Sequence, residues 1–241
     1  MKICFFGTGH GVPEAHKKCT ATLLQVGENS YLFDAGCDVA YEMAEKRVKF
    51  DSLKALFITH SHSDHTNGIV PLLAIASWYY TSCDPKVYFP NEGMRNSYLE
   101  HVLPYAQAGV RDKDNLRWYS AGEVYDDGVI KVTAYKTEHC HDSHCFLVEA
   151  EGKRVLFGGD MKNPKIDFPP VDDLDAAIVE GAHFYIIDYE EPFKERKIKA
   201  AYINHYGNYI GLMNAPHLRP LQKAVPEMKI TLATDGMDIE V

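Results

Sequence analysis

The sequence contains no apolar run approaching the roughly 20 residues that span a bilayer, and it lacks a surplus of basic side chains. Its formal net charge is −9, from 25 lysines and arginines against 34 aspartates and glutamates. A general nucleic-acid-binding protein carries the opposite, basic field. A small anionic substrate is compatible with this charge, because a bound cation can dominate its neighbourhood. We therefore predict such a substrate, and neither a membrane nor a nucleic-acid partner.

The six cysteines show neither a CxxC pair nor a dense framework, and this spacing argues against structural disulfides. The N-terminal run from Met1 to Gly7 has a strand pattern, and no apolar signal-peptide region or cleavage site follows it. We therefore expect a soluble protein in a reducing, cytoplasmic setting.

No linker, repeat or low-complexity segment divides the 241 residues, and the hydrophobic content of 46% is enough for one domain. The strand-then-helix order occurs twice, which predicts two similar halves that divide near residue 125, with facing sheets and outer helices. The tract 161–173 contains three prolines and is predicted as a loop. Helices are predicted at 38–47, 65–81, 91–107 and 216–224. Strands are predicted at 2–6, 20–26, 30–34, 55–59, 86–89, 129–135, 145–149, 153–157, 175–179, 199–203 and 228–233.

A short run carries four potential metal ligands within six positions: His60, His62, Asp64 and His65. It follows a short apolar strand and precedes an apolar helix pattern, so it lies in a turn at the C-terminal end of a strand. Such dense imidazole and carboxylate groups need partners when they are buried. A bound transition metal would be that partner.

Four more residues lie just after predicted strands, namely Asp34, His139, Asp160 and His205. A single histidine after a strand is more often a hydrogen-bonded loop residue, so the inference depends on the whole set converging on one sheet edge. Imidazole nitrogen with some carboxylate oxygen suits Zn²⁺, and also Mn²⁺ or Fe²⁺.

With this ligand set the chain resembles the metallo-β-lactamase superfamily, through the full HxHxDH motif and the later His, Asp and His in the family's order. The opening run from Phe5 to Pro13 resembles the FLGTGxxxP start of the ribonuclease Z and cyclic phosphodiesterase branch. The run from Ile230 to Met237 resembles the closing strand of such proteins. The resemblance implies an α/β (α+β) fold, a four-layer αββα sandwich of two mixed sheets, formed as a single domain by residues 1–241.

The resemblance also implies a site with two divalent metals, Zn²⁺ in the first place and Mn²⁺ or Fe²⁺ as alternatives. Asp34 would orient a ligand histidine from behind. Homodimers are common in the superfamily, and by analogy one is possible here. His60, His62 and His139 would hold one metal, Asp64, His65 and His205 the second, and Asp160 would bridge the two.

Some assignments have alternatives. Aligning this region with the HxxxSxGY pattern of ribonuclease Z makes His139 the ligand, and His141 is the alternative. Cys140 and Cys145 are either thiolate ligands or, as we favour, small buried residues.

A strand-end pair, Glu180 and His183, resembles the acidic loop of the family. Our hypothesis is that His183, together with Glu180, transfers a proton to the leaving group. The alternative is a hydrogen-bonded structural pair.

Two departures from ribonuclease Z bear on the substrate. That enzyme carries a long tRNA-gripping arm between the third histidine and the bridging aspartate, whereas here only 21 positions separate His139 from Asp160. The HST element before the last ligand histidine is also missing between 184 and 205. These absences argue against tRNA processing and favour small phosphodiesters, such as cyclic nucleotides or cyclic ribose phosphates.

We predict a dinuclear metal-dependent hydrolase, a phosphodiesterase in which a metal-bridging hydroxide attacks phosphorus and Asp64 can accept its proton. An acyl hydrolase acting on a thioester, lactone or β-lactam is the alternative, because the same ligands serve both. A non-catalytic metal-binding sensor is the second alternative. An oxygen-reducing di-iron role fits less well, because it needs a flavin partner domain and an acidic residue in place of His62.

Overall fold

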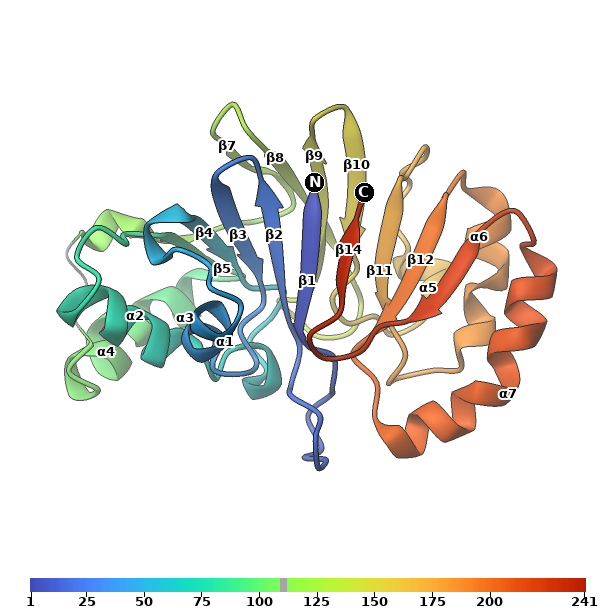
Figure 1. The fold of residues 1–241 in the computed structure, drawn as a ribbon, viewed down its shortest axis with the longest axis horizontal. Helices are drawn as coiled ribbons and strands as arrows, with labels where there is room; N and C mark the ends of the chain where they lie inside the picture. The colour runs from blue at the N-terminus through green and yellow to red at the C-terminus, as the bar shows by residue number, and fades with distance from the viewer. Residues whose placement is uncertain (109–111) are drawn as a thin grey trace.

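The strands of the computed structural model form two seven-stranded mixed sheets (Figure 1). The structure describes residues 1–108 and 112–241, with the backbone alone for 208–215. The first sheet contains β1 (Lys2–Gly7), β2 (Ala21–Val26), β3 (Asn29–Phe33), β4 (Leu53–Phe57), β5 (Lys86–Phe89), β6 (Leu116–Trp118) and β14 (Asp238–Glu240). The second contains β7 (Gly122–Asp126), β8 (Lys131–Lys136), β9 (His144–Ala150), β10 (Lys153–Phe157), β11 (Ala176–Glu180), β12 (Ala200–Asn204) and β13 (Lys229–Leu232).

The two sheets repeat one pattern of strand directions. In the first, β14, β1, β2 and β3 pair antiparallel, and β3, β4, β5 and β6 pair parallel. In the second, β7 to β10 pair antiparallel, and β10 to β13 pair parallel. The parallel strands of each sheet end at one edge, which gathers the loops that follow them.

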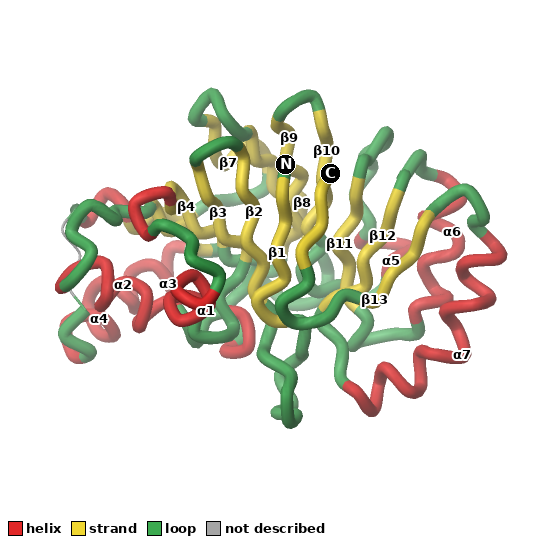
Figure 2. Tube along the Cα trace, viewed as in Figure 1, coloured by secondary structure: helices red, strands yellow, loops and turns green. Residues whose placement is uncertain are grey.

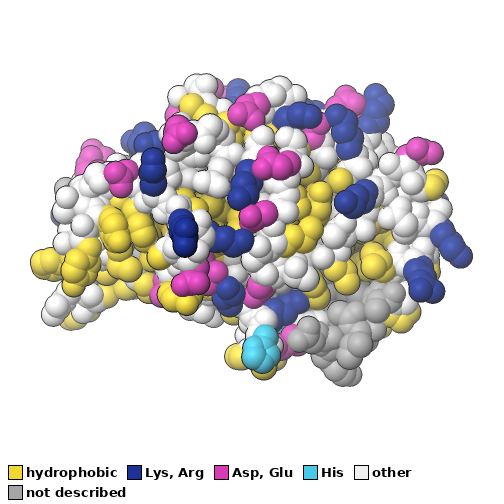
Figure 3. All heavy atoms as spheres, viewed as in Figure 1, with side chains coloured by type: hydrophobic (Ala, Val, Ile, Leu, Met, Phe, Trp, Pro, Cys, Tyr) yellow, Lys and Arg dark blue, Asp and Glu magenta, His cyan; other side chains and the backbone are white. Residues whose placement is uncertain are grey.

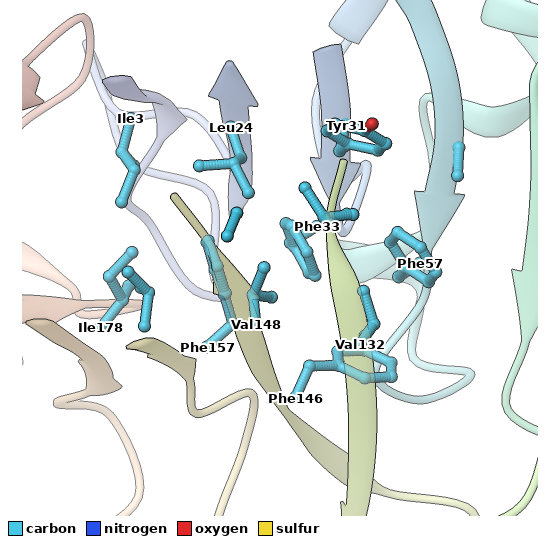
Figure 4. Close-up of a cluster of buried hydrophobic side chains, with 14 of the residues drawn as sticks. Ile3, Leu24, Tyr31, Phe33, Phe57, Val132, Phe146, Val148, Phe157 and Ile178 are labelled. Atoms are coloured by element: carbon cyan, nitrogen blue, oxygen red, sulfur yellow. The ribbon is translucent and has the colours of Figure 1, made fainter. Parts of the chain in front are cut away.

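The space between the sheets is filled by apolar side chains that alternate along each strand. In β1, Ile3 and Phe5 face the other sheet, whereas Cys4 and Phe6 belong to the core on the opposite face. The same period of two recurs in β4 from Ala55 to Phe57. Figure 4 shows side chains of both sheets meeting in this central layer, among them Phe33, Phe57, Phe146 and Phe157.

The outer face of each sheet is covered by helices (Figure 2). The first sheet carries α1 (Val39–Glu45), α2 (Ile69–Trp78), α3 (Glu92–Ser97) and α4 (Leu103–Tyr105). The second carries α5 (Pro164–Asp167), α6 (Glu190–Glu195) and α7 (Asn208–Ala224). The predicted fold class, an αββα sandwich of two mixed sheets, is confirmed.

Three local predictions need correction. The last helix begins at Asn208 rather than at 216. The predicted start was Pro216, because proline is common at the first position of a helix, but Pro216 lies inside α7. The predicted loop 161–173 contains the short helix α5, which Asn163 caps by accepting a hydrogen bond from the backbone N–H of Lys165. The predicted closing strand is interrupted at 233–237, so that β13 ends in the second sheet and β14 pairs with β1 in the first.

The six cysteines are free thiols. Over the described residues, no helix combines the length and the apolarity that crossing a bilayer requires.

Candidate metal centre

The predicted ligands converge at one edge of the two sheets. Asp34 follows β3, the run from His60 to His65 follows β4, and His139 follows β8. Asp160 follows β10 and His205 follows β12. Because these strand ends share one edge, residues far apart in sequence become neighbours, as the strand pattern predicted.

One group of donor atoms surrounds His62. Nδ1 of His62 lies 2.9 Å from Nε2 of His60 and 3.3 Å from Nε2 of His139. Oδ2 of Asp160 lies 3.6 Å from Nε2 of His60 and 3.6 Å from Nε2 of His139. One donor atom from each of these four residues lies within 4.8 Å of the others, a spacing that can hold a metal ion.

A second group of donor atoms also lies close to Asp160. Nε2 of His205 lies 3.1 Å from Oδ2 of Asp160 and 3.9 Å from Oδ2 of Asp64. Nε2 of His65 lies 3.4 Å from Oδ1 of Asp160 and 3.8 Å from Oδ2 of Asp64. Asp160 therefore touches both groups, the place that the resemblance gives to a bridging carboxylate.

The two groups fit a metal because they contain buried polar atoms that make no hydrogen bond to any described residue. His65 and Asp160 are each 1% exposed, yet Nε2 of His65 and Oδ1 of Asp160 lack a hydrogen-bond partner among the residues that the structure describes. Such buried atoms are rare and need an explanation. Divalent cations would satisfy both, and the mixture of imidazole nitrogen and carboxylate oxygen is the donor set of Zn²⁺, Mn²⁺ or Fe²⁺ sites.

The electrostatics of the two groups also favour a cation. Burial, and then the neighbouring His65, lower the pKa of His60, so its ring is neutral and offers a lone pair. Burial alone would raise the pKa of Asp160, but His205 and His65 outweigh it and hold that pKa well below its usual range. Burial alone would lower the pKa of His65, yet Asp160 and then Asp34 raise it well above its usual value. The site therefore favours positive charge beside Asp160.

Asp34 contacts the ring of His65 from behind, at the place that the resemblance gives to an orienting carboxylate. Its Oδ2 lies 2.8 Å from Nδ1 of His65, which leaves Nε2 of that ring facing Asp160. The backbone of Asp34 is left-handed, with φ 58°, and so is that of His205, with φ 45°. Such conformations cluster at functional sites in folded proteins.

Thr59 is a site residue that the sequence reasoning missed. Its hydroxyl lies 3.0 Å from Oδ2 of Asp34 and 3.0 Å from Nδ1 of His60. The hydroxyl can donate to the carboxylate and accept from the ring, which aims Nε2 of His60 at Asp160. Its position directly before the HxHxDH run was the available signal.

Asp160 depends on the glycine before it. Gly159 has φ +56°, and a Cβ there would lie 2.8 Å from the carbonyl oxygen of His144 and 3.0 Å from Cβ of Thr59. Only glycine fits this conformation and this close approach. The loop can therefore turn sharply after β10 and present Asp160 between the two groups.

His183 and Glu180 form a hydrogen-bonded pair beside the two groups. Glu180 is 1% exposed, and its Oε2 accepts from Nδ1 of His183 over 2.8 Å. Burial alone would lower the pKa of His183, but Glu180 and then Asp160 raise it to about 9. The ring of His183 lies 4.5 Å from that of His139 between centroids. Glu180 thus orients a protonated histidine at the rim of the site.

The neighbours of His139 lie elsewhere. The side chain of His141 is 82% exposed, and Nδ1 of His144 donates to the carbonyl of Asp142 over 2.8 Å. Cys145 is fully buried in the core of the second sheet's outer face. Cys140 donates to Oδ1 of Asp142 over 3.1 Å. The structure therefore places His139, and none of these neighbours, beside His62 and Asp160.

The sequence matches a known family over most of its length. The model of the family described as Anti-Pycsar protein Apyc1 matches residues 1–178. The chain belongs to this family.

The chain is also similar in sequence to ribonucleases. Ribonuclease Z of Listeria innocua is 28% identical over 175 residues, which are 71% of this chain and 56% of that protein. Ribonuclease BN of Escherichia coli O7:K1 is 30% identical over 157 residues, 64% of this chain and 51% of that protein. The chain thus spans about half the length of the curated relatives it matches.

The solved structure of the metallo-β-lactamase fold protein YhfI from Bacillus subtilis has the same fold. It superposes with a TM-score of 0.78 at 18% identity, over 100% of this chain and 99% of that one. The predicted superfamily and its ribonuclease Z-like branch are confirmed. The prediction of a hydrolase agrees with the relatives' names. Because two of those names are ribonucleases, the expected absence of a nucleic-acid partner stays a prediction. The cytoplasmic setting and the homodimer also stay predictions.

Proposed function

We propose that this Apyc1-family chain is a metal-dependent phosphodiesterase that hydrolyses a small phosphodiester, such as a cyclic nucleotide or a cyclic ribose phosphate. The observation that carries the proposal is the position of Asp160, whose carboxylate lies within 3.6 Å of ring nitrogens from both groups of histidines. A site of two adjacent cations suits phosphate esters, because both the attacking and the leaving oxygen can be stabilised.

The two groups of side chains described above provide the metal ligands in this proposal. Bound there, two divalent cations, Zn²⁺ in the first place, would bind the phosphate and acidify a water molecule. Asp34 and Thr59 keep the ligand rings in the required tautomer, and Asp64 is placed to accept a proton because its side chain is partly exposed, at 15%. We assign His60, His62 and His139 to one metal, Asp64, His65 and His205 to the other, and Asp160 to both.

The proton for the leaving group comes from His183 in this proposal. Its Nδ1 is held by Glu180, so the opposite nitrogen, Nε2, is the atom that can give up a proton. The side chain is 39% exposed at the rim, where a leaving oxygen would emerge. Glu180 is buried and accepts four hydrogen bonds, which supports an orienting role for this carboxylate.

The small size of the substrate is supported by the interval between His139 and Asp160. That interval consists of a turn, the hairpin of β9 and β10, and the glycine loop after it, with no room for an arm. The net charge of −9 also argues against a large nucleic-acid substrate. On the face shown in Figure 3, acidic and basic side chains are interspersed rather than gathered into a basic field.

The substrate class is tested by parallel assays of the metal-loaded protein on bis-p-nitrophenyl phosphate, a 3′,5′-cyclic nucleotide, a thioester and nitrocefin. We expect hydrolysis of the two phosphodiesters. Turnover of an acyl substrate alone would establish the acyl hydrolase instead, and metal-loaded protein that hydrolyses none of the four would favour the sensor. His139→Ala should abolish activity, and His141→Ala, a matched exposed histidine two positions away, should retain it.

A further inference from the structure

Asp235 joins both ends of the loop between β1 and β2. Its Oδ1 accepts from the backbone N–H of Thr8 over 2.9 Å and from the hydroxyl of Thr8 over 2.7 Å. Its Oδ2 accepts from the backbone N–H of Lys18 over 2.8 Å. Thr8 begins this loop and Lys18 lies near its end, so one carboxylate closes the segment 8–18 at its base.

Asp235 is itself held firmly. The N–H of Gly236 donates to the carbonyl of Phe5 over 2.7 Å, and the N–H of Phe5 donates to the carbonyl of Met237 over 2.9 Å. Lys46 donates to the carbonyl of Gly236 over 2.6 Å. In Figure 1 the chain between β13 and β14 crosses at the base of the projecting β1–β2 loop. The carboxylate is therefore a fixed anchor for the loop.

The loop so anchored touches the second group of ligands. The carbonyl of Gly9 accepts from Nδ1 of His205 over 3.2 Å, which leaves Nε2 of that ring toward Asp64 and Asp160. Gly11 lies against Asp64, since a Cβ at Gly11 would be 3.1 Å from its Oδ2. The first loop thus supports two of the four side chains assigned to the second metal.

A further bond ties the loop to the strand end that carries His205. The backbone N–H of Tyr206 donates to the carbonyl of Thr8 over 3.0 Å, and the N–H of Gly9 donates to the carbonyl of Lys18 over 2.7 Å. Thr8 is therefore held by Asp235 on one side and bonded to the residue after His205 on the other. A shift of Thr8 would move the Gly9 carbonyl away from Nδ1.

We propose that Asp235 is a positioning residue for the second metal, acting through Thr8 and Gly9 on the ring of His205. This inference rests on the proposed function, because it presumes a metal held by Asp64, His65 and His205. The acceptor of a ligand histidine's second ring nitrogen fixes its tautomer and orientation, and loss of such support typically weakens metal binding about 10- to 100-fold. Here the acceptor is a backbone carbonyl, so it can be displaced only by releasing the loop that carries it.

The test is Zn²⁺ titration of the metal-free protein by calorimetry, comparing wild type, Asp235→Ala, Asp235→Asn and Thr8→Val. We expect Asp235→Ala to weaken the second equivalent about tenfold or more while the first is unchanged. Asp235→Asn should lie between, because an amide oxygen can still accept from Thr8 whereas its NH₂ cannot accept from Lys18. Thr8→Val removes one hydroxyl donor and should show the smallest loss of affinity for the second Zn²⁺. It replaces Asp235→Ala as the test variant if the alanine variant fails to fold.

Asp127→Ala is the matched control. Asp127 also joins a hairpin, accepting from the N–H groups of Val129 and Ile130 over 2.9 Å each, and from the hydroxyls of Tyr31 and Tyr125. Its turn, between β7 and β8, lies at the opposite end of the sheets from the β1–β2 loop (Figure 1). We expect Asp127→Ala to lower thermal stability and to leave both Zn²⁺ affinities unchanged.

A metal-free readout separates this inference from the proposed function. In wild-type protein, the ¹⁵N shift of Nδ1 of His205 should report a proton hydrogen-bonded to the Gly9 carbonyl, and Asp235→Ala should change this shift because the carbonyl moves away. If Asp235→Ala binds two Zn²⁺ as tightly as wild type does, the positioning role is wrong. If wild type binds fewer than two, the proposed metal centre fails, and the Nδ1 shift alone decides the role of Asp235.

Discussion

Thr59 donates its backbone N–H to Oδ1 of Asp34 over 2.8 Å, and its hydroxyl lies 3.0 Å from Oδ2 of the same carboxylate. Through this pair, the two groups of candidate metal ligands share one support. Asp34 holds His65 of the second group directly, and the Thr59 hydroxyl holds His60 of the first. The two halves of the site are therefore expected to respond together when this support is changed.

Thr59→Val keeps the shape of the side chain and removes the hydroxyl. We expect Zn²⁺ affinity at the His60 site to fall about tenfold, because Nδ1 of His60 loses its acceptor. Binding at the His65 site should fall less, since its contact with Asp34 remains. Calorimetric titration measures both, and Thr59→Ser should restore the first. Equal affinities in Thr59→Val and wild type would contradict the shared support.

The seven candidate ligands could be predicted from the sequence because each follows a predicted strand, and these strands of the two facing sheets end at the same edge of the sandwich. Thr59, Gly9 and Asp235 could not be predicted in this way. Their contributions are hydrogen bonds to a neighbouring ring or loop, which depend on distances of a few tenths of an ångström. The sequence pattern gives the residue type at these positions and does not identify the hydrogen-bond partner of each one.

His183→Ala tests the source of the leaving-group proton. We expect kcat to fall about 100-fold or more on a cyclic nucleotide, whose leaving alkoxide needs a proton, and to change little on bis-p-nitrophenyl phosphate, whose leaving group does not. Zn²⁺ stoichiometry should stay that of wild type. His141→Ala is the control with unchanged kcat. Full kcat of His183→Ala on the cyclic nucleotide would rule out proton transfer, and loss of a metal equivalent would make His183 a ligand.

Phe33→Ala tests the central layer between the sheets. The ring of Phe33 stacks on Phe157 with centroids 3.8 Å apart and also contacts Phe57. Removing a buried phenyl ring leaves a cavity, so we expect the free energy of unfolding to fall by about 3–5 kcal/mol. Ile166→Ala, at a side chain that is 64% exposed, should change it by less than about 0.5 kcal/mol. Urea denaturation of the metal-free proteins measures both, and similar losses in the two variants would contradict this description of the core.

Asp175 provides a pH-dependent contribution to stability. Burial alone would raise the pKa of Asp175, but hydrogen bonds from Lys199 and then from Arg154 and Lys153 lower it from 3.8 to about 2. A lowered carboxyl pKa stabilises the folded state above the unfolded value, and this stabilisation is lost as the pH falls from about 4 to about 2. Asp175→Asn should therefore lower the free energy of unfolding at pH 6, by an amount that shrinks below pH 4.

Urea titrations of Asp175→Asn between pH 6 and pH 3 check this dependence. Asp173→Asn is the control, because the side chain of Asp173 is 68% exposed and its nearest cation, on Lys197, lies 3.5 Å away. A difference between Asp175→Asn and wild type that stays constant over this range would show that the carboxylate charge contributes nothing.

Most of the fold could be predicted, because alternating and continuous apolar runs identify a strand regardless of the sheet to which the strand belongs. Two features depended on tertiary context instead. Pro216 favours a helix start in isolation, yet α7 continues through it. The chain after β13 leaves its sheet so that β14 can pair with β1, and no local pattern encodes that partner. Such long-range pairing is decided by the packing of the two sheets against each other.

A single titration distinguishes a two-metal phosphodiesterase from the alternatives. Metal-free protein is titrated with Zn²⁺ while hydrolysis of a 3′,5′-cyclic nucleotide is followed. We predict negligible hydrolysis without metal and a rate that levels off at two equivalents per chain. A maximum at one equivalent, or no hydrolysis with two Zn²⁺ bound, would contradict a two-metal phosphodiesterase.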